Sequence, residues 1–566
     1  MGRIWWKESV GYQIYVKSFK DGNNDGIGDL PGMTEKLDHL SQLGVNLVWI
    51  GPFYDSPMDD NGYDVRDFRR VDPTYGTTAD LRRLVDKAHS LGIRVIFDLV
   101  LNHTSDEHPW FQESRSSSDN PKHDFYIWHE GRVKDGVRVE PTNWGSFFGG
   151  SCWTYDASRD AYYMHIFSKK MPDLNWANPE VRKHMADVAR WWLDFGADGF
   201  RIDAVSHLDR APFEDIPTEE PGPVLDWHRF SNLPKVHDYL KELARDVFIP
   251  SGCLTIGEVG GEAGIAEGLR YAMPSSGELS MVFNFDHNWC LKRQDADNPE
   301  QTVTDVGCLR RAFMRWAEAF AGEGWLPLNW LNHDQPRLLG HYGSTVYPER
   351  SAKMLATLTH MMRGTPFIYQ GEEIGMTNPP FKKASDFRDI STFSHIESLK
   401  KTMPDASLET RVRIAARTSR DNPRTPMQWS DGPYAGFSDH EPWIGVHPEY
   451  PTCNVEAQRD NPDSVLSHYR TLIALRLHSR FKDVILDGSI TYIDIDDPDM
   501  VNYVRNDGKT QLLCLNVMHD VTRTYDVSGY DILDILVHNA GTPDITHHTL
   551  TLKPFESVVF EVKEKS

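Results

Sequence analysis

The sequence has no long apolar run and no excess of positive charge. No segment approaches the roughly 18 apolar residues that a membrane-spanning helix needs. The 83 Asp and Glu residues outnumber the 60 Lys and Arg residues, so the formal net charge is −23. Negative charge repels nucleic-acid phosphates and anionic lipid surfaces. We therefore expect neither a nucleic-acid partner nor a membrane partner.

Cysteine is also sparse, and no two cysteines stand in a C-x-x-C pair. The six are scattered as Cys152, Cys253, Cys290, Cys308, Cys453 and Cys514. This spacing favours reduced thiols over a disulfide framework or a zinc site. The first 19 residues interrupt their apolar side chains with Lys7, Glu8 and Lys17, so they lack the apolar core of a secretory signal. Together these features predict a reducing, cytoplasmic location.

Internal repeats are absent, and the 566 residues instead alternate short apolar runs with helical patterns. One helix, expected over 179–195, follows Asn178 and ends at Gly196, as capping preferences favour. The apolar runs predict eight strands, at 12–19, 47–52, 94–101, 199–204, 254–259, 281–285, 327–332 and 366–370. Eight successive β-then-α units predict an α/β fold built on a (β/α)8 TIM barrel.

Two stretches interrupt this alternation. Residues 104–175 are polar, aromatic and glycine-rich, which indicates a subdomain inserted after the third strand. From about residue 484 short alternating strands replace the helices, and those at 500–505 and 511–517 are joined across the turn residues 506–508. We expect a catalytic barrel of residues 1–103 and 176–480, an inserted subdomain of 104–175 and an antiparallel β-domain of 481–566.

Ionisable side chains stand at the ends of four expected strands. They are Asp98 with His103, Arg201 with Asp203, Glu258, and His333 with Asp334. One acidic residue after a strand is usually a helix cap, but four coinciding strand ends indicate a site. In such barrels the active site lies where the strands end and the βα loops begin.

An excess of carboxylates favours acetal hydrolysis over metal chemistry at this site. A zinc hydrolase usually needs two histidines close together on one strand, and the first strand offers none. In acetal hydrolysis one carboxylate attacks while a protonated one releases the leaving oxygen. Arg201 shares a strand face with Asp203 and can keep that carboxylate ionised. We therefore expect Asp203 to be the nucleophile and Glu258 the acid/base.

Several motifs resemble those of one enzyme family. The segments 98–103, 199–203, Glu258 and 332–334 resemble the four signature regions of the α-amylase family, glycoside hydrolase family 13. Residues 5–15, 21–29, 61–64 and 420–429 are similar to its oligo-1,6-glucosidase and α-glucosidase subgroup. The resemblance implies a retaining, exo-acting α-glucosidase that acts on small oligosaccharides or disaccharides without an organic cofactor. We expect a monomer or a weak homo-oligomer.

The resemblance also implies roles for individual residues. Asp334 would orient the sugar hydroxyls at subsite −1, the position of the glucose that is released. Asp64 and Arg420 would close the pocket behind that glucose and favour attack from the chain end. The remaining substrate-binding candidates are Tyr63, His103, Phe167, Arg201, Ala204 and His333.

A calcium site is expected near the N-terminus. Oxygen ligands alternate around Gly26 as in the first half of an EF-hand loop, although no bidentate Glu follows at the twelfth place. The resemblance implies one structural Ca²⁺ held by Asp21, Asn23, Asp25, Asp29 and the Ile27 carbonyl. The alternative is a solvated turn.

The expected linkage preference depends on Ala204, which follows the nucleophile. Relatives specific for α-1,6 bonds usually carry Val at this place, so the sequence favours α-1,4 bonds, as in maltose and short malto-oligosaccharides. Met171 stands where the subgroup usually has Gln and leaves oligo-1,6-glucosidase activity open. Residues 291–296 lack the isomerase stretch Arg-Leu-Asp-Arg-Asp, which disfavours sucrose isomerisation but leaves sucrose hydrolysis and glucosyl transfer open. A catalytically silent transporter subunit is the non-enzyme alternative.

Overall fold

The fold is a closed parallel barrel with helices around it. The computed structural model describes residues 3–219, 221–293 and 302–565. Within them one parallel sheet has the order β13-β12-β11-β5-β2-β1-β17-β16, and its end strands β13 and β16 contact each other. The strands are β1 (Gly11–Ile14), β2 (Leu47–Ile50), β5 (Arg94–Val100), β11 (Gly199–Asp203), β12 (Leu254–Glu258), β13 (Met281–Phe283), β16 (Pro327–Leu328) and β17 (Thr365–Tyr369). The predicted TIM barrel is confirmed.

Strand register brings the ionisable side chains together. Arg201 on β11 pairs with Asp98 on β5 and with Ile256 on β12. Asp203 and Glu258 each lie two residues beyond these paired positions. Because side chains alternate along a strand, all four ionisable groups lie on the same face of the sheet. The register therefore places two carboxyl groups side by side at the C-terminal edge.

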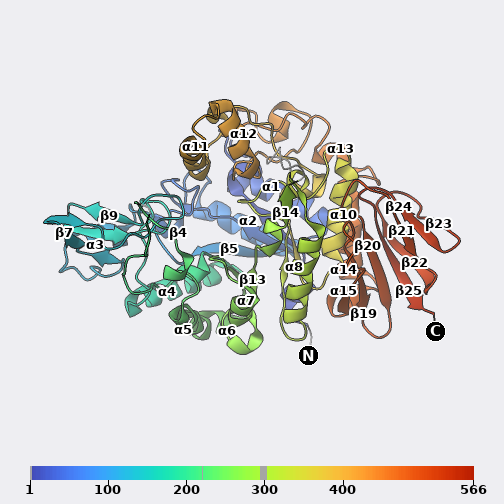
Figure 1. Cartoon of the computed structure of the whole chain (residues 1–566), viewed down its shortest axis with the longest axis horizontal. Helices are drawn as coiled ribbons and strands as arrows, with labels where there is room; N and C mark the ends of the chain where they lie inside the picture. The colour runs from blue at the N-terminus through green and yellow to red at the C-terminus, as the bar shows by residue number, and fades with distance from the viewer. Residues whose placement is uncertain (1–2, 220, 294–301, 566) are drawn as a thin grey trace.

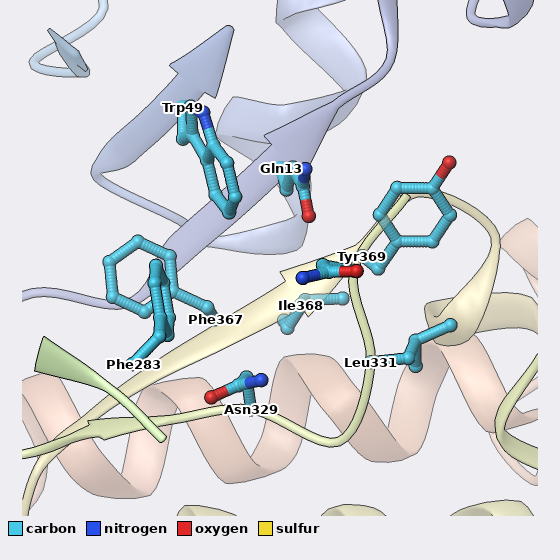
Figure 2. Close-up of a pocket in the computed structure, with 9 residues that line it drawn as sticks. Gln13, Trp49, Phe283, Asn329, Leu331, Phe367, Ile368 and Tyr369 are labelled. Atoms are coloured by element: carbon cyan, nitrogen blue, oxygen red, sulfur yellow. The ribbon is translucent and has the colours of Figure 1, made fainter. Parts of the chain in front are cut away.

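The interior of the barrel is a packed core and not a channel. Figure 2 shows Trp49, Phe283 and Phe367, from three strands, around a small cavity. Its volume is about 10 Å³, roughly the space that one water molecule needs. Trp49 and Phe283 stack with ring centroids 5.5 Å apart. Substrate therefore has no place inside the barrel and must bind at its mouth.

Helices surround the barrel in the expected alternation. They include α1 (Leu30–Leu43), α2 (Thr78–Ser90), α4 (Pro179–Phe195), α5 (Pro234–Leu243), α7 (Ile265–Ala272), α8 (Val306–Ala319), α10 (Pro348–His360) and α14 (Val465–His478). Helix α4 has the predicted bounds. The Asn178 side chain accepts from the Glu180 N–H, and Gly196 ends the helix with φ 112°, a left-handed conformation that favours glycine.

Two sets of antiparallel strands flank the barrel at opposite ends of the molecule (Figure 1). Between β5 and α4 the chain forms the sheet β6 (Trp128–His129), β10 (Ala161–Met164) and β9 (Trp153–Asp156), and the hairpin of β7 (Arg132–Lys134) and β8 (Val137–Val139). After α15 (Lys482–Leu486) come β18 (Ser489–Ile493), β19 (Asn502–Asn506), β20 (Gln511–Asn516), β25 (Ser557–Glu564) and β22 (Tyr530–His538) in one sheet, and β21 (Arg523–Asp526), β24 (Thr549–Leu552) and β23 (Asp544–Thr546) in another.

Two expectations about local structure were wrong. The first strand ends at Ile14, because the Tyr15 N–H donates to the Gln370 side chain and residues 16–18 form a 3-10 turn. Cys290 and Cys308 form a disulfide with Cα atoms 5.3 Å apart, although their spacing favoured free thiols. Antiparallel pairing of β14 (Leu291–Arg293) with β15 (Thr302–Thr304) brings the two cysteines together. No helix among the described residues is both long and apolar enough to span a membrane.

Candidate active site

A cavity of about 960 Å³ opens at the C-terminal ends of the strands. Most of the predicted site residues line it: Tyr63, His103, Phe167, Asp203, Ala204, Glu258, Asp334 and Arg420. Arg201, His333 and Asp64 do not line it, and all three are buried. The structure thus separates side chains that can touch a substrate from those that can only act through a neighbour.

Arg201 holds three carboxylates at once. Its Nη1 donates to Asp98 Oδ1 (2.7 Å) and Asp203 Oδ1 (2.8 Å), and its Nη2 lies 2.6 Å from Glu258 Oε2. The guanidinium is buried, and charge-assisted bonds of this length are strong and directional. One side chain therefore fixes the positions of both the expected nucleophile and the expected acid.

The two catalytic candidates differ in their proton affinity. Burial raises the pKa of Asp203 to about 6, with Arg201 opposing the shift. Burial, together with the neighbouring charges of Asp203 and Asp334 and against the opposing charge of Arg201, raises the pKa of Glu258 to about 7. Both carboxyl groups are held by the one guanidinium of Arg201. Glu258 is thus the carboxyl group that keeps its proton more readily.

Asp334 is ionised, unlike its neighbour Glu258. Burial favours its neutral form, but the charges of Arg420 and Arg424 hold the pKa of Asp334 well below its usual range. Arg424 Nη2 lies 2.5 Å from Asp334 Oδ1, and the Asn332 side chain accepts from the Asp334 N–H. Asp334 is therefore a fixed anion at the cavity wall.

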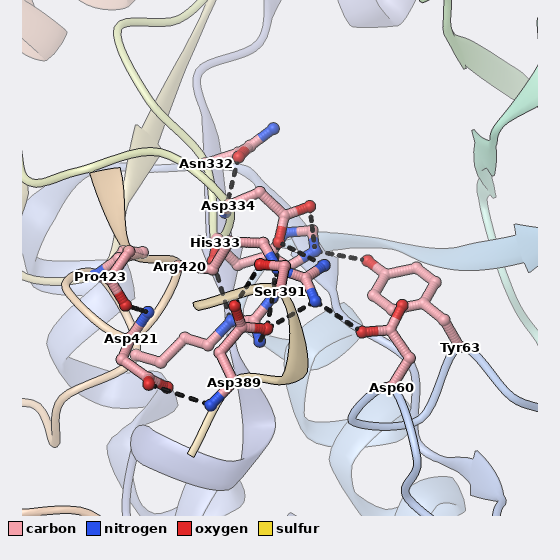
Figure 3. A network of polar contacts seen from close by, with 12 residues as sticks. Asp60, Tyr63, Asn332, His333, Asp334, Asp389, Ser391, Arg420, Asp421 and Pro423 are labelled. Carbon is pink, nitrogen blue, oxygen red and sulfur yellow. Dashed lines mark hydrogen bonds and ion pairs between the residues drawn. The ribbon is translucent and has the colours of Figure 1, made fainter. Parts of the chain in front are cut away.

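The wall behind Asp334 differs from the predicted one. Arg420 does not contact Asp64; its Nη2 lies 2.8 Å from Asp60 Oδ1 and 2.5 Å from Asp389 Oδ1. Figure 3 shows Arg420 between these two carboxylates, with Asp334 beside it. Asp64 is buried and accepts from Ser56 Oγ and from the N–H groups of residues 59 and 60. The Asp64–Arg420 pairing was wrong, because Asp64 shapes the turn that presents Asp60.

Sequence reasoning missed Asp60, Asp389 and Arg424. Asp60 stands three residues before Tyr63 in a turn where Asp59 and Asp64 are equally acidic, so composition alone did not single it out. Asp389 precedes α11 (Ile390–Thr402) and caps it by accepting from the Thr392 N–H. In the sequence, a position before a helix indicates only a helix cap. The contact of Asp389 with Arg420 depends on the tertiary structure.

The two histidines are neutral and differ in their partners. Burial lowers the pKa of His333 to about 3 and that of His103 to about 4. His333 Nε2 lies 2.8 Å from the Tyr63 hydroxyl, and its Nδ1 lies 2.8 Å from Gln13 Nε2. His103 Nε2 has no partner among the described residues. His103 therefore has a ring nitrogen available for a sugar hydroxyl, whereas His333 orients Tyr63.

The predicted calcium ligands lie in one turn before α1: Asp21, Asn23, Asp25, Ile27 and Asp29. The carboxylates of Asp21 and Asp29 accept hydrogen bonds from backbone N–H groups, whereas Asn23 and Asp25 are exposed. Among the described residues no three His, Cys, Asp or Glu side chains are arranged to hold a metal ion. The oxygen donors are nevertheless of the type that Ca²⁺ prefers. Calcium binding therefore stays a prediction.

Comparison with known proteins places the chain among carbohydrate enzymes. The family model described as alpha amylase, catalytic domain, matches residues 13–483. The oligo-1,6-glucosidase of Parageobacillus thermoglucosidasius is 41% identical over 577 residues, covering 100% of both chains. The alpha-glucosidase of Pediococcus pentosaceus is 39% identical, covering 99% of both. An isomaltulose synthase variant from Erwinia rhapontici NX5, solved with its natural substrate sucrose, superposes with a TM-score of 0.91 at 36% identity, covering 100% of both chains.

Proposed function

Because the chain belongs to the α-amylase family of glycoside hydrolases and is an enzyme of the α-glucosidase type, we propose that it releases single glucose units, with retention, from the non-reducing ends of short α-glucosides. One observation carries this proposal. Arg201 holds Asp203 and Glu258 side by side at the edge of the cavity that Asp334 also lines. Because one guanidinium binds both carboxyl groups, they lie close together, which supports the short separation of about 5–5.5 Å of retaining enzymes, with no water between nucleophile and sugar.

The chemistry follows from the two proton affinities. Asp203, ionised, attacks the anomeric carbon while Glu258 donates its proton to the leaving oxygen, so the glycosidic bond breaks as the glycosyl–Asp203 ester forms. Glu258 then takes a proton from water, whose oxygen attacks the anomeric carbon and releases Asp203. Asp334 stays ionised throughout and binds sugar hydroxyls beside the reacting carbon.

Attack from the chain end is supported by the wall that Arg420 forms with Asp60 and Asp389. Asp60 and Arg420 line the cavity near Asp334 and can bind the outer hydroxyls of a terminal glucose, while the buried Asp389 holds Arg420 in place. Maltotetraose labelled at its reducing end tests this. Early release of one unlabelled glucose supports exo attack, and early release of labelled maltose contradicts it.

Two linkage preferences are candidates. The relatives named oligo-1,6-glucosidase support a preference of this protein for α-1,6 bonds, because their similarity spans the whole chain. The small side chain of Ala204, which lines the cavity, favours α-1,4 bonds. The relatives carry more weight, because the α-1,4 argument depends on one residue. The α-1,4 preference remains our prediction from sequence, with the α-1,6 preference as its better-supported competitor.

One substrate panel tests both proposals. kcat/KM is measured on maltose, isomaltose and sucrose, and the anomer first released is identified by NMR. α-Glucose as the first anomer supports retention, and β-glucose contradicts it. Asp203→Asn and Glu258→Gln, which keep the shape of the site, should each lower kcat by roughly 1,000-fold or more. The ratio of maltose to isomaltose cleavage decides between the two linkages.

We further propose that Ca²⁺ binds the turn of residues 21–29 in a structural role. Binding only to the folded state raises stability. The midpoint of thermal unfolding, Tm, should therefore rise when Ca²⁺ is added after chelation. In Asp25→Ala the rise on adding Ca²⁺ should disappear; because Asp25 also accepts from the Ile27 N–H and from Asn23 Nδ2, the variant is compared with itself before and after Ca²⁺ is added. An unchanged wild-type Tm would contradict the proposal.

A further inference from the structure

His333 has a close partner at each of its two ring nitrogens. Its Nε2 lies 2.8 Å from the Tyr63 hydroxyl and 3.4 Å from Asp334 Oδ2, and Figure 3 shows both contacts. Its Nδ1 lies 2.8 Å from Nε2 of Gln13, a buried residue of β1. Tyr63 and Asp334 line the active-site cavity, whereas Gln13 does not. Gln13 can therefore act on the reaction only through His333.

The contacts of His333 determine where its proton lies. The ring is neutral, because burial lowers the pKa of His333 to about 3, so it carries one proton. Asp334 is ionised, and a carboxylate oxygen can only accept a hydrogen bond. The proton is therefore on Nε2, and Nδ1 is an acceptor that the amide NH₂ group of Gln13 can serve. This assignment directs the Gln13 nitrogen to His333 and leaves its oxygen facing the small cavity of Figure 2.

The proton on Nε2 decides which bonds Tyr63 can make. His333 donates to the Tyr63 oxygen, so Tyr63 cannot give its own proton to His333. Arg201 Nη1, 3.4 Å from the same oxygen, can also only donate. The Tyr63 proton is thus left for Asp98 Oδ2, at 3.5 Å, or for a sugar oxygen in the cavity. A proton on Nδ1 instead would turn Nε2 into an acceptor that takes the Tyr63 proton.

We propose that Gln13 is a positioning residue that keeps the His333 proton on Nε2 and thereby keeps Tyr63 a hydrogen-bond donor toward the substrate. The imidazole has little freedom to reorient, because the rings of Tyr15 and Tyr63 lie nearly parallel to it, at interplanar angles of 11° and 12°. The role of Tyr63 at the sugar rests on the proposed function. The position of the His333 proton does not, since it can be measured without substrate.

NMR of protein labelled with ¹⁵N in its histidine side chains measures that position. His333, identified by the signals that His333→Gln lacks, should be neutral and protonated on Nε2 in the wild type. Gln13→Glu replaces the donor by a carboxylate, so at pH 8 it should place a proton on Nδ1. Gln13→Met, which fills similar volume without donating, should weaken the preference for Nε2. The signals of His103, whose Nδ1 lies 3.2 Å from Asn102 Nδ2, should stay unchanged.

Kinetics measures the consequence for catalysis. Gln13→Glu should lower kcat on maltose by roughly tenfold, the effect of losing one well-placed hydrogen bond. Tyr63→Phe should lower kcat as well, and adding Gln13→Glu to it should cause little further loss, because both changes remove the same donor. Gln370→Glu is the matched control. Gln370 is also buried but binds backbone groups of Tyr15 and Ser18, so this variant should leave the His333 signals unchanged.

The outcomes separate this inference from the proposed function. If the wild type releases no glucose from maltose, isomaltose or sucrose, the proposed function fails, and the NMR spectra still decide the role of Gln13. A wild-type His333 protonated on Nδ1, or unchanged His333 signals in folded Gln13→Glu, overturns the inference. Independent, additive losses in Gln13→Glu and Tyr63→Phe also overturn it, because Gln13 would then not act through Tyr63.

Discussion

Asp60 and Asp64 lie four residues apart and contribute differently to the site. Asp60 faces Arg420 across the cavity wall, whereas Asp64 is buried beneath the turn. Asp60→Asn should lower kcat/KM on maltose by roughly 100-fold, because binding groups that position the sugar act on the reaction barrier. Its Tm should change little. Kinetics and thermal unfolding of the purified variant check this. Unchanged kinetics would show that the Asp60–Arg420 ion pair has only a structural role.

Asp64→Ala should show the opposite pattern. It leaves the N–H groups of residues 59 and 60 and the Ser56 hydroxyl without their acceptor. A buried donor without a partner costs about 1–3 kcal/mol. We therefore expect a lower Tm. Activity on maltose should fall only if the substitution also disturbs the turn that holds Asp60. A variant with wild-type Tm and strongly reduced kcat/KM would show that Asp64 binds substrate after all.

The dependence of activity on pH follows from the two carboxyl groups that Arg201 holds. Asp203, with a pKa of about 6, must be ionised, so kcat/KM should fall below that pH. Glu258, with a pKa of about 7, must be protonated, so kcat/KM should fall above that pH. The profile should be a narrow bell between these values. In Glu258→Gln, assayed on α-glucosyl fluoride, which needs no acid, the alkaline limb should disappear.

Stability should depend on pH in a related way. The pKa of Glu258 is higher in the folded state than in the unfolded state, where it is near 4.5. Glu258 therefore stabilises the fold at pH values below about 4.5, and this contribution is lost as the pH rises through about 7. When Glu258 is ionised, the single charge of Arg201 also has to balance three carboxylates, those of Asp98, Asp203 and Glu258. Glu258→Gln should therefore raise Tm at pH 8 more than at pH 5. A larger gain at pH 5 would contradict the assignment.

Residue roles could be predicted from sequence where strand periodicity fixes a side chain. Asp203 and Glu258 end buried strands, so their convergence followed from the expected register. Asp60 could not be separated from Asp64, because spacing inside a turn does not tell which carboxylate points inward. The Cys290–Cys308 disulfide was missed for the same reason, since it depends on the pairing of β14 with β15.

At the scale of elements, strand bounds were predicted best where both faces are buried. Strand β12 ends at Glu258, one residue before the expected end, and β2 and β5 begin at the expected residues. Strand β16 has only two residues of the six expected, and of residues 329–332 that follow it only Asn332 lines the active-site cavity. Residues 294–296, part of the stretch that disfavoured isomerisation, lie outside the described residues.

The end of β11 has a consequence for the linkage experiment. Ala204 follows the strand with φ 46° and ψ 35°, the left-handed region, which β-branched residues rarely adopt. Ala204→Val should shift the kcat/KM ratio toward isomaltose by roughly tenfold. It should also lower Tm through backbone strain. Ala435→Val, at a buried left-handed alanine outside the cavity lining, is the matched control, which should lower Tm without shifting the ratio.

At the scale of the whole molecule, the inserted segment and the C-terminal sheets attach to the barrel differently. Phe147, Phe148 and Phe167 of the inserted segment line the cavity directly. The C-terminal strands contribute no residue to the cavity lining and meet the barrel beside α10 and α14 (Figure 1). Changes in the inserted segment should therefore alter substrate choice, whereas changes in the C-terminal sheets should alter stability alone.

One buried arginine makes the second attachment, and another, within the barrel, supports the connection that the first one reaches. Arg505 on β19 donates to the Met361 carbonyl of the barrel and to the carbonyls of Gly488 and Ser489. Arg476 on α14 donates to carbonyls of residues 360, 362 and 364 in the same connection. Burial lowers the pKa of Arg505 to about 10. The guanidinium is therefore still charged at neutral pH, and its partners are backbone carbonyls, which the sequence pattern of a β-strand did not reveal.

Arg505→Met tests this attachment, because methionine fills similar volume without donating. Three buried carbonyls lose their donor, so the free energy of unfolding should fall by about 2–4 kcal/mol. Arg480→Met, which removes a pair between the exposed Arg480 and the largely buried Glu561 in the same region, should lower Tm much less. Both variants should keep wild-type kcat/KM on α-glucosyl fluoride at 25 °C, since neither residue reaches the cavity lining. Equal Tm values for the two variants would show that Arg505 contributes no more than a surface ion pair, and lost activity in folded Arg505→Met would show that the C-terminal sheets influence catalysis.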